Sequence, residues 1–241
     1  MAVVLVTGGA GYIGSHTCKQ LAAAGHTPVT YDSLEHGHRE AVRWGPLVVG
    51  NLRDRARLSA TLEEYRPECV LHFAAYIDVG GSVRDPLRFY ENNVGGSLTL
   101  LQAMKDQGLD TLVFSSTCAV YGVPVRLPLD ENHPKAPANP YGSSKWMVEC
   151  LLRDAGAAHG LRSVALRYFN ACGADHDGED DGAVGDEGAS PNVVGPGGGL
   201  RDGDRGGAGD VVGGEVQDGS VEAQAGVLHH VGVDVVNAGF Q

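Results

Sequence analysis

This chain of 241 residues lacks the cysteine and histidine spacing that disulfide frameworks and zinc sites need. Its five cysteines, at positions 18, 69, 118, 150 and 172, are odd in number and scattered, and none belongs to a C-x-x-C pair. That pattern favours reduced thiols in a cytosol over a disulfide framework. No group of histidines has metal-ligand spacing on one helix or strand, so we expect no metal.

Positive charge is also in short supply, because 18 lysines and arginines face 30 aspartates and glutamates. The resulting net charge of −12 argues against nucleic acid and anionic membrane surfaces as partners. No apolar run approaches the length of a transmembrane helix. The N-terminus has no basic region before its first apolar run, Val3–Val6, so we expect no signal peptide and a cytoplasmic protein.

A further shortage is confined to the C-terminal quarter, where side-chain variety falls after Ala174. This segment is mainly Gly, Ala, Val, Asp and Glu, holds about half of the 36 glycines, and has Phe240 as its one aromatic residue. Such a composition buries too little apolar surface to offset the entropy of ordering the chain. We therefore expect a folded domain over residues 1–175 and an atypical, disordered tail over residues 176–241.

The composition of this tail suggests an origin. Its five dominant amino acids are those whose codons begin with G, as expected when a GC-rich gene is translated out of frame. We hypothesise that the chain beyond about His176 is a frameshift product or a sequencing artefact. The alternative is a natural acidic tail, which the same reading frame in re-sequenced source DNA would establish.

Before the tail, short apolar runs alternate with stretches of helical periodicity. We predict strands over Val3–Thr7, Pro28–Asp32, Pro46–Gly50, Cys69–Ala75, Thr111–Ser115 and Arg162–Tyr168. Helices are predicted over Tyr12–Ala24, Arg55–Tyr65, Pro86–Gln107 and Tyr141–His159, each followed within two residues by glycine or proline. This alternation predicts an α/β fold with a doubly wound parallel (Rossmann) sheet and helices on both faces. Ligands bind such sheets at the carboxyl ends of the strands.

A glycine-rich turn links the first strand to the first helix. The sequence Thr7–Gly14 has glycines at positions 8, 11 and 14 and matches G-x-G-x-x-G through positions 9, 11 and 14. The first glycines permit a tight turn and close approach of a pyrophosphate, and the last lets helix and strand pack. The helix N-terminus adds N–H groups and a positive dipole. The alternative is a turn without a ligand, which the strand–turn–helix context disfavours.

Further candidates for this site follow the next strands. A carboxylate at Asp32 would bind adenosine ribose hydroxyls and repel a 2′-phosphate, which favours NAD over NADP. Asp54 is a candidate for the adenine amino group, or it is the N-cap of the helix that begins at Arg55. Phe73 lies in a small apolar segment where the cofactor would pass. Asn93 is within reach of it, or it is a solvated helix residue.

The pair Tyr141 and Lys145 indicates the chemistry. Their i,i+4 spacing puts both on one helix face, where a lysine ammonium favours the phenolate and lowers the pKa of the tyrosine towards neutrality. Such a tyrosine exchanges a proton with a sugar hydroxyl. After the fifth strand, the hydroxyl of Thr117 could hold the reacting oxygen beside Tyr141. Together with the glycine turn, this predicts hydride transfer between a carbinol and a nicotinamide cofactor.

On these motifs the chain resembles the extended short-chain dehydrogenases, and within them the UDP-glucose 4-epimerase family. The resemblance runs from residue 1 to about residue 178. It rests on sequence blocks at both ends of the predicted domain: Thr7–Gly14, Tyr31–Val42, His72–Ala75, Asn92–Val94, Phe114–Gly122, Asn139–Lys145 and Arg167–Ala174.

The resemblance implies roles for individual residues. Tyr141 is then the acid/base, Lys145 tunes it and binds the nicotinamide ribose, and Thr117 assists at the substrate hydroxyl. The residues that would line NAD are Gly8, Gly11, Tyr12, Ile13, Gly14, Asp32, Asp54, Phe73, Ala74, Asn93, Ser115, Tyr141, Lys145, Tyr168 and Phe169. The substrate would meet Thr117, Tyr141 and Asn170, the last of these at its diphosphate.

By the same resemblance, the reaction interconverts UDP-glucose and UDP-galactose. Tyrosinate takes the 4-hydroxyl proton while the C4 hydride passes to NAD, and the 4-keto sugar turns over before it takes the hydride back. Family members dimerise through helices corresponding to Pro86–Gln107 and Tyr141–His159, so we expect a homodimer. The family keeps its substrate domain mostly in the C-terminal third, whose signatures this sequence lacks. We therefore expect weak NAD affinity and negligible turnover.

Two alternatives stay open. One is another NAD-dependent nucleotide-sugar epimerase or dehydratase, although a 4,6-dehydratase places Asp-Glu after its helper threonine, where this chain has Cys118-Ala119. The other is a non-catalytic NAD-binding remnant, which an intact Tyr141–Lys145 pair does not exclude. The chain also has Gly81 where the family has Glu, and Ile77 where some relatives have Lys.

Overall fold

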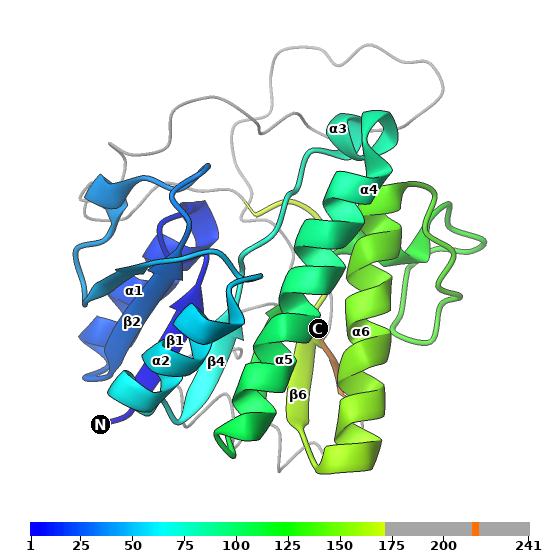
Figure 1. Ribbon diagram of the computed structural model, residues 1–241. Helices are drawn as coiled ribbons and strands as arrows, with labels where there is room; N and C mark the ends of the chain where they lie inside the picture. The colour runs from blue at the N-terminus through cyan, green and yellow to red at the C-terminus, as the bar shows by residue number, and fades with distance from the viewer. Residues whose placement is uncertain (172–213, 217–241) are drawn as a thin grey trace.

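The computed structural model describes residues 1–171 and 214–216, which form a seven-stranded sheet with helices on both faces (Figure 1). The first six strands are parallel and are β1 (Val3–Thr7), β2 (Thr27–Asp32), β3 (Leu47–Val49), β4 (Cys69–His72), β5 (Thr111–Ser115) and β6 (Arg162–Leu166). They lie in the order β3-β2-β1-β4-β5-β6, and β7 (Gly214–Val216) adds an antiparallel edge. The strand order reverses between β1 and β4, so the carboxyl ends of these two strands are the expected ligand site. The predicted fold class is confirmed.

The helices begin and end at residues that suit their caps. They are α1 (Tyr12–Ala23), α2 (Arg55–Tyr65), α3 (Val79–Arg84), α4 (Pro86–Phe89), α5 (Gly96–Asp106) and α6 (Pro140–His159), with short turns η1 (Arg39–Ala41) and η3 (Cys118–Tyr121). Asn139 caps α6 by accepting the N–H of Gly142 at 2.8 Å, and Pro140 opens its first turn. Gly160 ends α6 in the left-handed conformation, at φ 74°.

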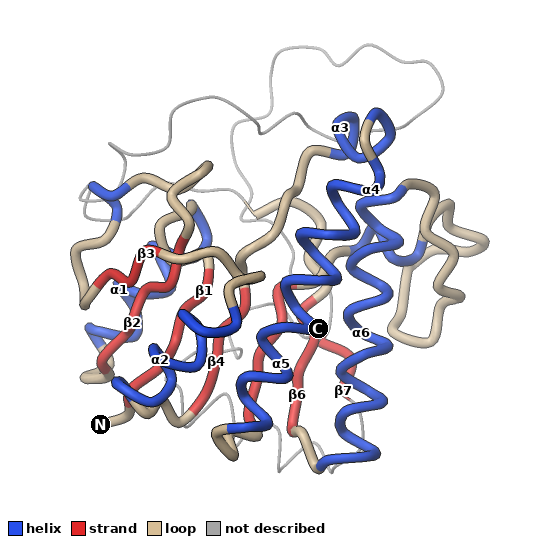
Figure 2. Tube along the Cα trace, in the orientation of Figure 1, coloured by secondary structure: helices blue, strands red, loops and turns tan. Residues whose placement is uncertain are grey.

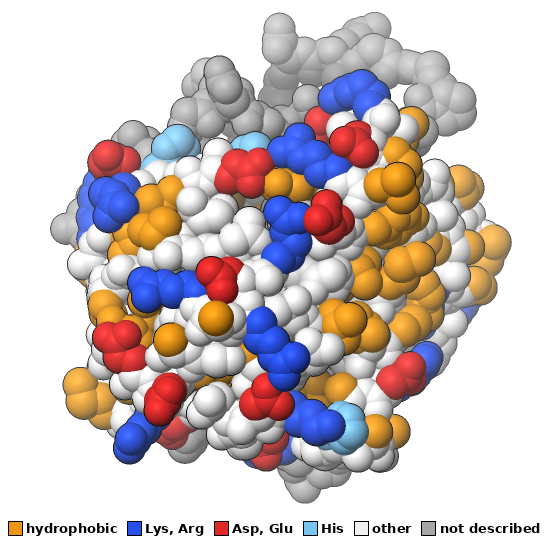
Figure 3. Space-filling view, in the orientation of Figure 1, with side chains coloured by type: hydrophobic (Ala, Val, Ile, Leu, Met, Phe, Trp, Pro, Cys, Tyr) orange, Lys and Arg blue, Asp and Glu red, His pale blue; other side chains and the backbone are white. Residues whose placement is uncertain are grey.

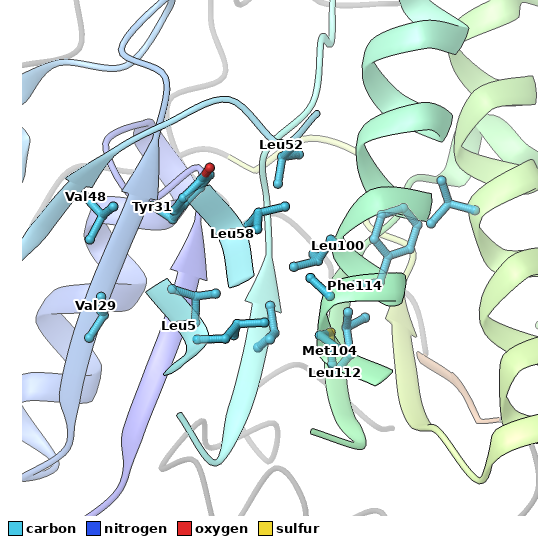
Figure 4. Packing of buried hydrophobic residues seen from close by; sticks show 14 of the residues in the cluster. Leu5, Val29, Tyr31, Val48, Leu52, Leu58, Leu100, Met104, Leu112 and Phe114 are labelled. Carbon is cyan, nitrogen blue, oxygen red and sulfur yellow. The ribbon is translucent and has the colours of Figure 1, made fainter. Parts of the chain in front are cut away.

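Both faces of the sheet are covered because alternate residues of each strand point to opposite sides. Leu5 of β1 packs with residues from α2, α5 and α6, such as Leu58, Leu100 and Val148. Figure 4 shows part of this cluster between the strands and the helices. Val4 and Val6 point the other way and pack with Cys18 and Leu21 of α1 and with neighbouring strands. This two-sided burial explains why the strands are continuous apolar runs.

Three predicted elements differ from the structure by more than one residue at an end or are interrupted. The fourth strand ends at His72 and the sixth ends at Leu166. The residues that follow them therefore form loops at the carboxyl end of the sheet. The long helix predicted over Pro86–Gln107 is interrupted by a π-helical stretch, η2 (Tyr90–Gly95). Within it the Asn93 carbonyl accepts the hydroxyl of Ser97 at 2.5 Å, and the Asn93 side chain points to neighbouring elements. Helix α3 was not predicted.

The predicted tail, residues 176–241, lies outside the described residues except for β7. The sequence predicts no strand there, yet Gly214–Val216 pairs with Val164–Leu166 of β6 (Figure 2). The unpaired edge of β6 supplies the backbone groups that this pairing satisfies. In the part of the chain that the structure describes, no helix is long and apolar enough to cross a membrane.

Candidate active site

The glycine turn, Gly8–Gly14, lies at the carboxyl end of β1, where Gly8 and Gly14 pack directly against backbone atoms. Gly8 has φ +74°, and a Cβ there would lie 2.6 Å from the backbone nitrogen of Ala74. A Cβ on Gly14 would lie 2.2 Å from the carbonyl oxygen of Gly8. Gly11 is the N-cap of α1 and makes no side-chain cap, and a Cβ there would meet Gly8 only at 3.4 Å. The turn therefore holds the first turn of α1, which includes Tyr12 and Ile13, close against β1 and the loop after β4.

Asp32 closes one side of this turn. Its buried carboxylate accepts the N–H of Ala10 at 3.0 Å and the N–H of Leu34 at 2.8 Å. Gly37 packs so closely that a Cβ there would lie 2.9 Å from Asp32 Oδ1. The structure thus brings Asp32 to the glycine turn, as predicted. Asp54 caps α2 by accepting the N–H of Arg57 at 2.9 Å, a role compatible with binding of adenine, and its side chain is exposed.

The loop after β4 forms the other side of the turn. The N–H groups of Phe73 and Ala74 both donate to the carbonyl of Thr7, at 2.9 and 3.1 Å. Asn93 is buried and holds the backbone of Tyr76, which follows β4. Its side chain accepts the Tyr76 N–H at 2.8 Å and donates to the Tyr76 carbonyl at 3.0 Å. Asn93 also donates to Ser144 Oγ of α6 at 3.1 Å. It is therefore not a solvated helix residue.

A buried hydrogen-bond relay links the ends of β1 and β4, and the sequence alone did not reveal it. His72 Nδ1 lies 2.7 Å from Thr7 Oγ1, and its Nε2 lies 2.8 Å from Ser97 Oγ. Ser97 uses its proton on the Asn93 carbonyl, so His72 donates from Nε2 and accepts the Thr7 hydroxyl at Nδ1. Burial, aided by the charge of Lys145, lowers the pKa of His72 to about 3, so the imidazole is neutral.

The second half of the site is the polar corner, which we define by the side chains gathered where β5, β6 and α6 meet: Ser115, Thr117, Tyr141, Lys145 and Tyr168. Thr117 Oγ1 accepts the N–H of Ala119 at 3.1 Å, and the Thr117 hydroxyl acts on the pKa of Tyr141. Lys145 Nζ donates to the Ser115 carbonyl at 3.0 Å, and the Tyr168 hydroxyl donates to Ser115 Oγ. The structure therefore brings all five predicted residues together.

The pKa values in the polar corner correct one prediction. Burial raises the pKa of Tyr141 to about 12, although its hydrogen bond with Thr117 opposes the rise. Burial also lowers the pKa of Lys145 to about 7, which Glu149 opposes. The Lys145 ammonium lies 6.0 Å from the centre of the Tyr141 ring and donates to Ser115 instead. The fold therefore raises the pKa of Tyr141, which is the opposite direction to the one predicted from the spacing of Tyr141 and Lys145.

Two predicted residues, Phe169 and Asn170, lie on the surface close to the corner in sequence. Phe169 is 43 % exposed, and Asn170 is also exposed. Both follow Tyr168 directly, at the carboxyl end of β6. Within residues 1–171 and 214–216, no three His, Cys, Asp or Glu side chains are grouped in a way that could hold a metal ion.

The glycine turn presents a helix N-terminus at the carboxyl end of the sheet, and the pair of Tyr141 and Lys145 lies at the same end. Together they define an α/β nucleotide-binding site with a proton-transfer group. The model of the NAD dependent epimerase/dehydratase family matches residues 4–186, and the chain belongs to this family.

Individual relatives narrow the comparison. A UDP-glucose 4-epimerase from Rhizobium meliloti (strain 1021) is 59% identical over 175 residues, which are 73% of this chain and 53% of that protein. The one from Azospirillum brasilense is 54% identical over 173 residues, which are 71% of this chain and 50% of that protein. The crystal structure of UDP-glucose 4-epimerase from Brucella ovis in complex with NAD has 55% identity and a TM-score of 0.73, over 74% of this chain and 55% of that one. The chain thus spans about half the length of these relatives.

Proposed function

We propose that this chain carries the cofactor-binding and proton-transfer half of a UDP-glucose 4-epimerase, which interconverts UDP-glucose and UDP-galactose. One observation carries the proposal: Tyr141, Lys145 and Thr117 lie together at the carboxyl end of the sheet, where the glycine turn also lies. The identity to the Rhizobium meliloti relative supports the same assignment. We also propose a domain boundary near residue 175 and a location in the cytoplasm, which the free thiols of Cys69, Cys118 and Cys150 favour.

The site fits NAD. The glycine turn excludes side-chain atoms from the start of α1, so a pyrophosphate can approach its backbone N–H groups. Asp32 stands where it can accept the ribose hydroxyls, and it keeps lone pairs beyond its two backbone hydrogen bonds. When bound, NAD supplies a reversible hydride acceptor and a positive charge near the phenol. We propose that the NAD-lining residues named from the family resemblance hold it here.

Proton transfer is then the task of Tyr141. With a pKa of about 12, its phenol is protonated at neutral pH, and the Thr117 hydroxyl acts to lower that pKa. It becomes a base for the sugar 4-hydroxyl only when positive charge lowers its pKa, and Lys145, 6.0 Å from the centre of its ring, is a protein group that can contribute. Thr117 would hold the reacting oxygen, and Asn170 would contact the diphosphate. Substrate binding beyond these contacts depends on the half of the relatives that this chain does not match.

A homodimer is part of the proposal. Figure 3 shows apolar side chains gathered over α6 and the helices beside it. Exposed residues on these elements include Val83, Leu87, Leu98 and Met147, at 64%, 77%, 42% and 45% exposure. A second copy that covers this face would remove apolar surface from water. Light scattering should therefore report a dimer, and Leu98→Glu with Met147→Glu should return it to a monomer.

The deciding experiment is a coupled assay for conversion of UDP-galactose to UDP-glucose. The chain alone should show negligible turnover. A chimera that joins residues 1–175 to the unmatched half of the Rhizobium meliloti relative should be active. In the chimera, Tyr141→Phe should reduce turnover by about 10²–10⁴-fold, because the proton-transfer group is lost.

Three results would contradict the proposal in different ways. A chimera that binds NAD without turnover would favour the non-catalytic module. Loss of water from the sugar would favour the dehydratase. Activity that survives Tyr141→Phe would remove the tyrosine from the mechanism.

A further inference from the structure

A buried ion pair lies directly behind the polar corner. Arg167 and Glu149 have side-chain exposures of 0% and 2%. Arg167 Nε donates to Glu149 Oε1 at 3.0 Å, and its Nη2 donates to Glu149 Oε2 at 2.5 Å. Such a two-pronged contact fixes orientation as well as distance. Because the cost of removing two charges from water can equal their attraction, stability alone does not account for this pair.

The pair joins three separate elements. Glu149 belongs to α6, and its Oε1 also accepts the hydroxyl of Ser116, which follows β5. Arg167 follows β6, and its Nη1 donates to the hydroxyl of Tyr121 in η3 at 3.0 Å. The Arg167 guanidinium also lies 5.1 Å from the centre of the Tyr121 ring. The ion pair therefore fastens α6 to the segments after β5 and β6.

Each anchoring residue adjoins a residue of the polar corner. Glu149 lies one helical turn beyond Lys145, which lies one turn beyond Tyr141, so the three share one face of α6. Ser116 immediately precedes Thr117, and Arg167 immediately precedes Tyr168.

We propose that Glu149, held by Arg167, is a positioning residue for Lys145, which it keeps in place and favours in its ammonium form, so that the pair of Tyr141 and Lys145 is competent. The inference deepens the proposed function, because it assigns the control of that pair to residues outside it.

The charges around Lys145 make this control specific. The negative charge of Glu149 raises the pKa of Lys145 and so opposes the effect of burial, which lowers it. Arg167 neutralises part of the Glu149 charge, so removing either partner should move the charge of Lys145 in opposite directions. Two further titratable groups near this lysine are Tyr141, whose ring centre is 6.0 Å away, and neutral His72.

The sequence offers a direct measurement, because it contains only four lysines: Lys19, Lys105, Lys135 and Lys145. In the full chain labelled with [ε-¹³C]lysine, carbon NMR reports the titration of each lysine, and Lys145→Arg assigns the signal. The native Lys145 signal should have its midpoint near pH 7, where the structure places its pKa at about 7. Glu149→Gln should shift this midpoint to lower pH, and Arg167→Met should shift it to higher pH.

The opposite signs separate positioning from packing. If the pair were only a packing element, both variants would admit water around Lys145 and both midpoints would rise. A rise in Glu149→Gln therefore overturns the proposal. If Glu149→Gln does not fold, Arg167→Lys decides the question: it keeps the charge balance, so the midpoint should stay near the native one, and a rise would overturn the proposal.

The matched control is Arg162→Met, which removes an exposed ion pair with Asp110 at 2.8 Å and should leave the Lys145 midpoint unchanged. The experiment needs neither NAD nor a sugar nucleotide. A failed epimerase assignment would therefore leave this result interpretable, and a failed prediction here would leave the epimerase assignment to its own assay.

Discussion

The glycine turn and the polar corner both lie at the carboxyl ends of the strands, but the turn is formed by backbone and the corner by side chains. The turn is shaped by backbone: missing Cβ atoms at Gly8 and Gly14 let it contact the loop after β4 and the start of α1. The corner is shaped by buried side chains from α6 and from the segments after β5 and β6. Binding of an anion by backbone requires N–H groups that no side chain covers, whereas proton transfer requires charged side chains at fixed places.

Two residues join these regions. His72 reaches Thr7 at the end of β1 and is affected by the charge of Lys145. Asn93 binds the backbone of Tyr76 on one side and Ser144 of α6 on the other. The comparison therefore predicts that the turn tolerates changes of charge but not of volume. The corner should respond to changes of charge, and the two joining residues should affect both regions.

Arg167→Met gives the largest expected effect and tests whether the corner depends on charge. The variant leaves Glu149 buried without its partner, which should lower the free energy of unfolding by about 3–5 kcal/mol. Urea denaturation measures the loss. Arg55→Met is the control, since its ion pair with Asp106 is half exposed and should contribute nothing measurable. Similar losses in the two variants would contradict the distinction.

Gly14→Ala tests whether the turn depends on volume. One methyl group there would overlap the carbonyl of Gly8, and we expect a loss of about 2–3 kcal/mol in unfolding free energy together with weaker NAD binding. Gly11→Ala adds the same methyl at 3.4 Å from that carbonyl and should change stability by less than about 1 kcal/mol. Calorimetry with NAD and urea denaturation give both readouts. Equal effects at the two positions would remove the steric argument.

The pH dependence of stability tests the neutral state of His72. Its pKa is about 3 in the fold and about 6.5 in the unfolded chain, so between these values only the unfolded state binds the proton. Stability should therefore fall as pH falls, by about 2 kcal/mol from pH 7 to pH 5. His72→Gln cannot titrate and should reduce this slope. An unchanged slope in the variant would show that other groups cause the acid sensitivity.

Asn93→Ala is expected to have the smallest effect. It leaves the N–H and the carbonyl of Tyr76 without their side-chain partner and should cost about 1–2 kcal/mol of unfolding free energy. Hydrogen exchange should show faster exchange in the loop after β4 and near the start of α6. Faster exchange confined to one of the two regions would contradict the joining role of Asn93.

The sequence predicted the fold class and the glycine turn because both depend on local patterns. Apolar runs such as Val3–Thr7 predict buried strands, and their alternation with helices leaves few topologies. The predicted residues Tyr141, Lys145 and Thr117 were also brought together, since helix spacing and strand ends determine their general place. The interruption of the long helix at Tyr90–Gly95 escaped prediction because it accompanies contacts of Asn93 with Tyr76 and Ser144, which are far from it in sequence.

What the sequence by itself determined is therefore the backbone: the strands, the helices, and the glycines that make the turn possible. Only the tertiary structure decided the electrostatics. Burial made Tyr141 a weaker acid and Lys145 a weaker base than free side chains, and it made His72 neutral. It also brought Glu149 and Arg167 together from different elements. The physical reason is that backbone geometry follows from neighbours along the chain, whereas desolvation and charge interactions depend on groups that meet only after folding.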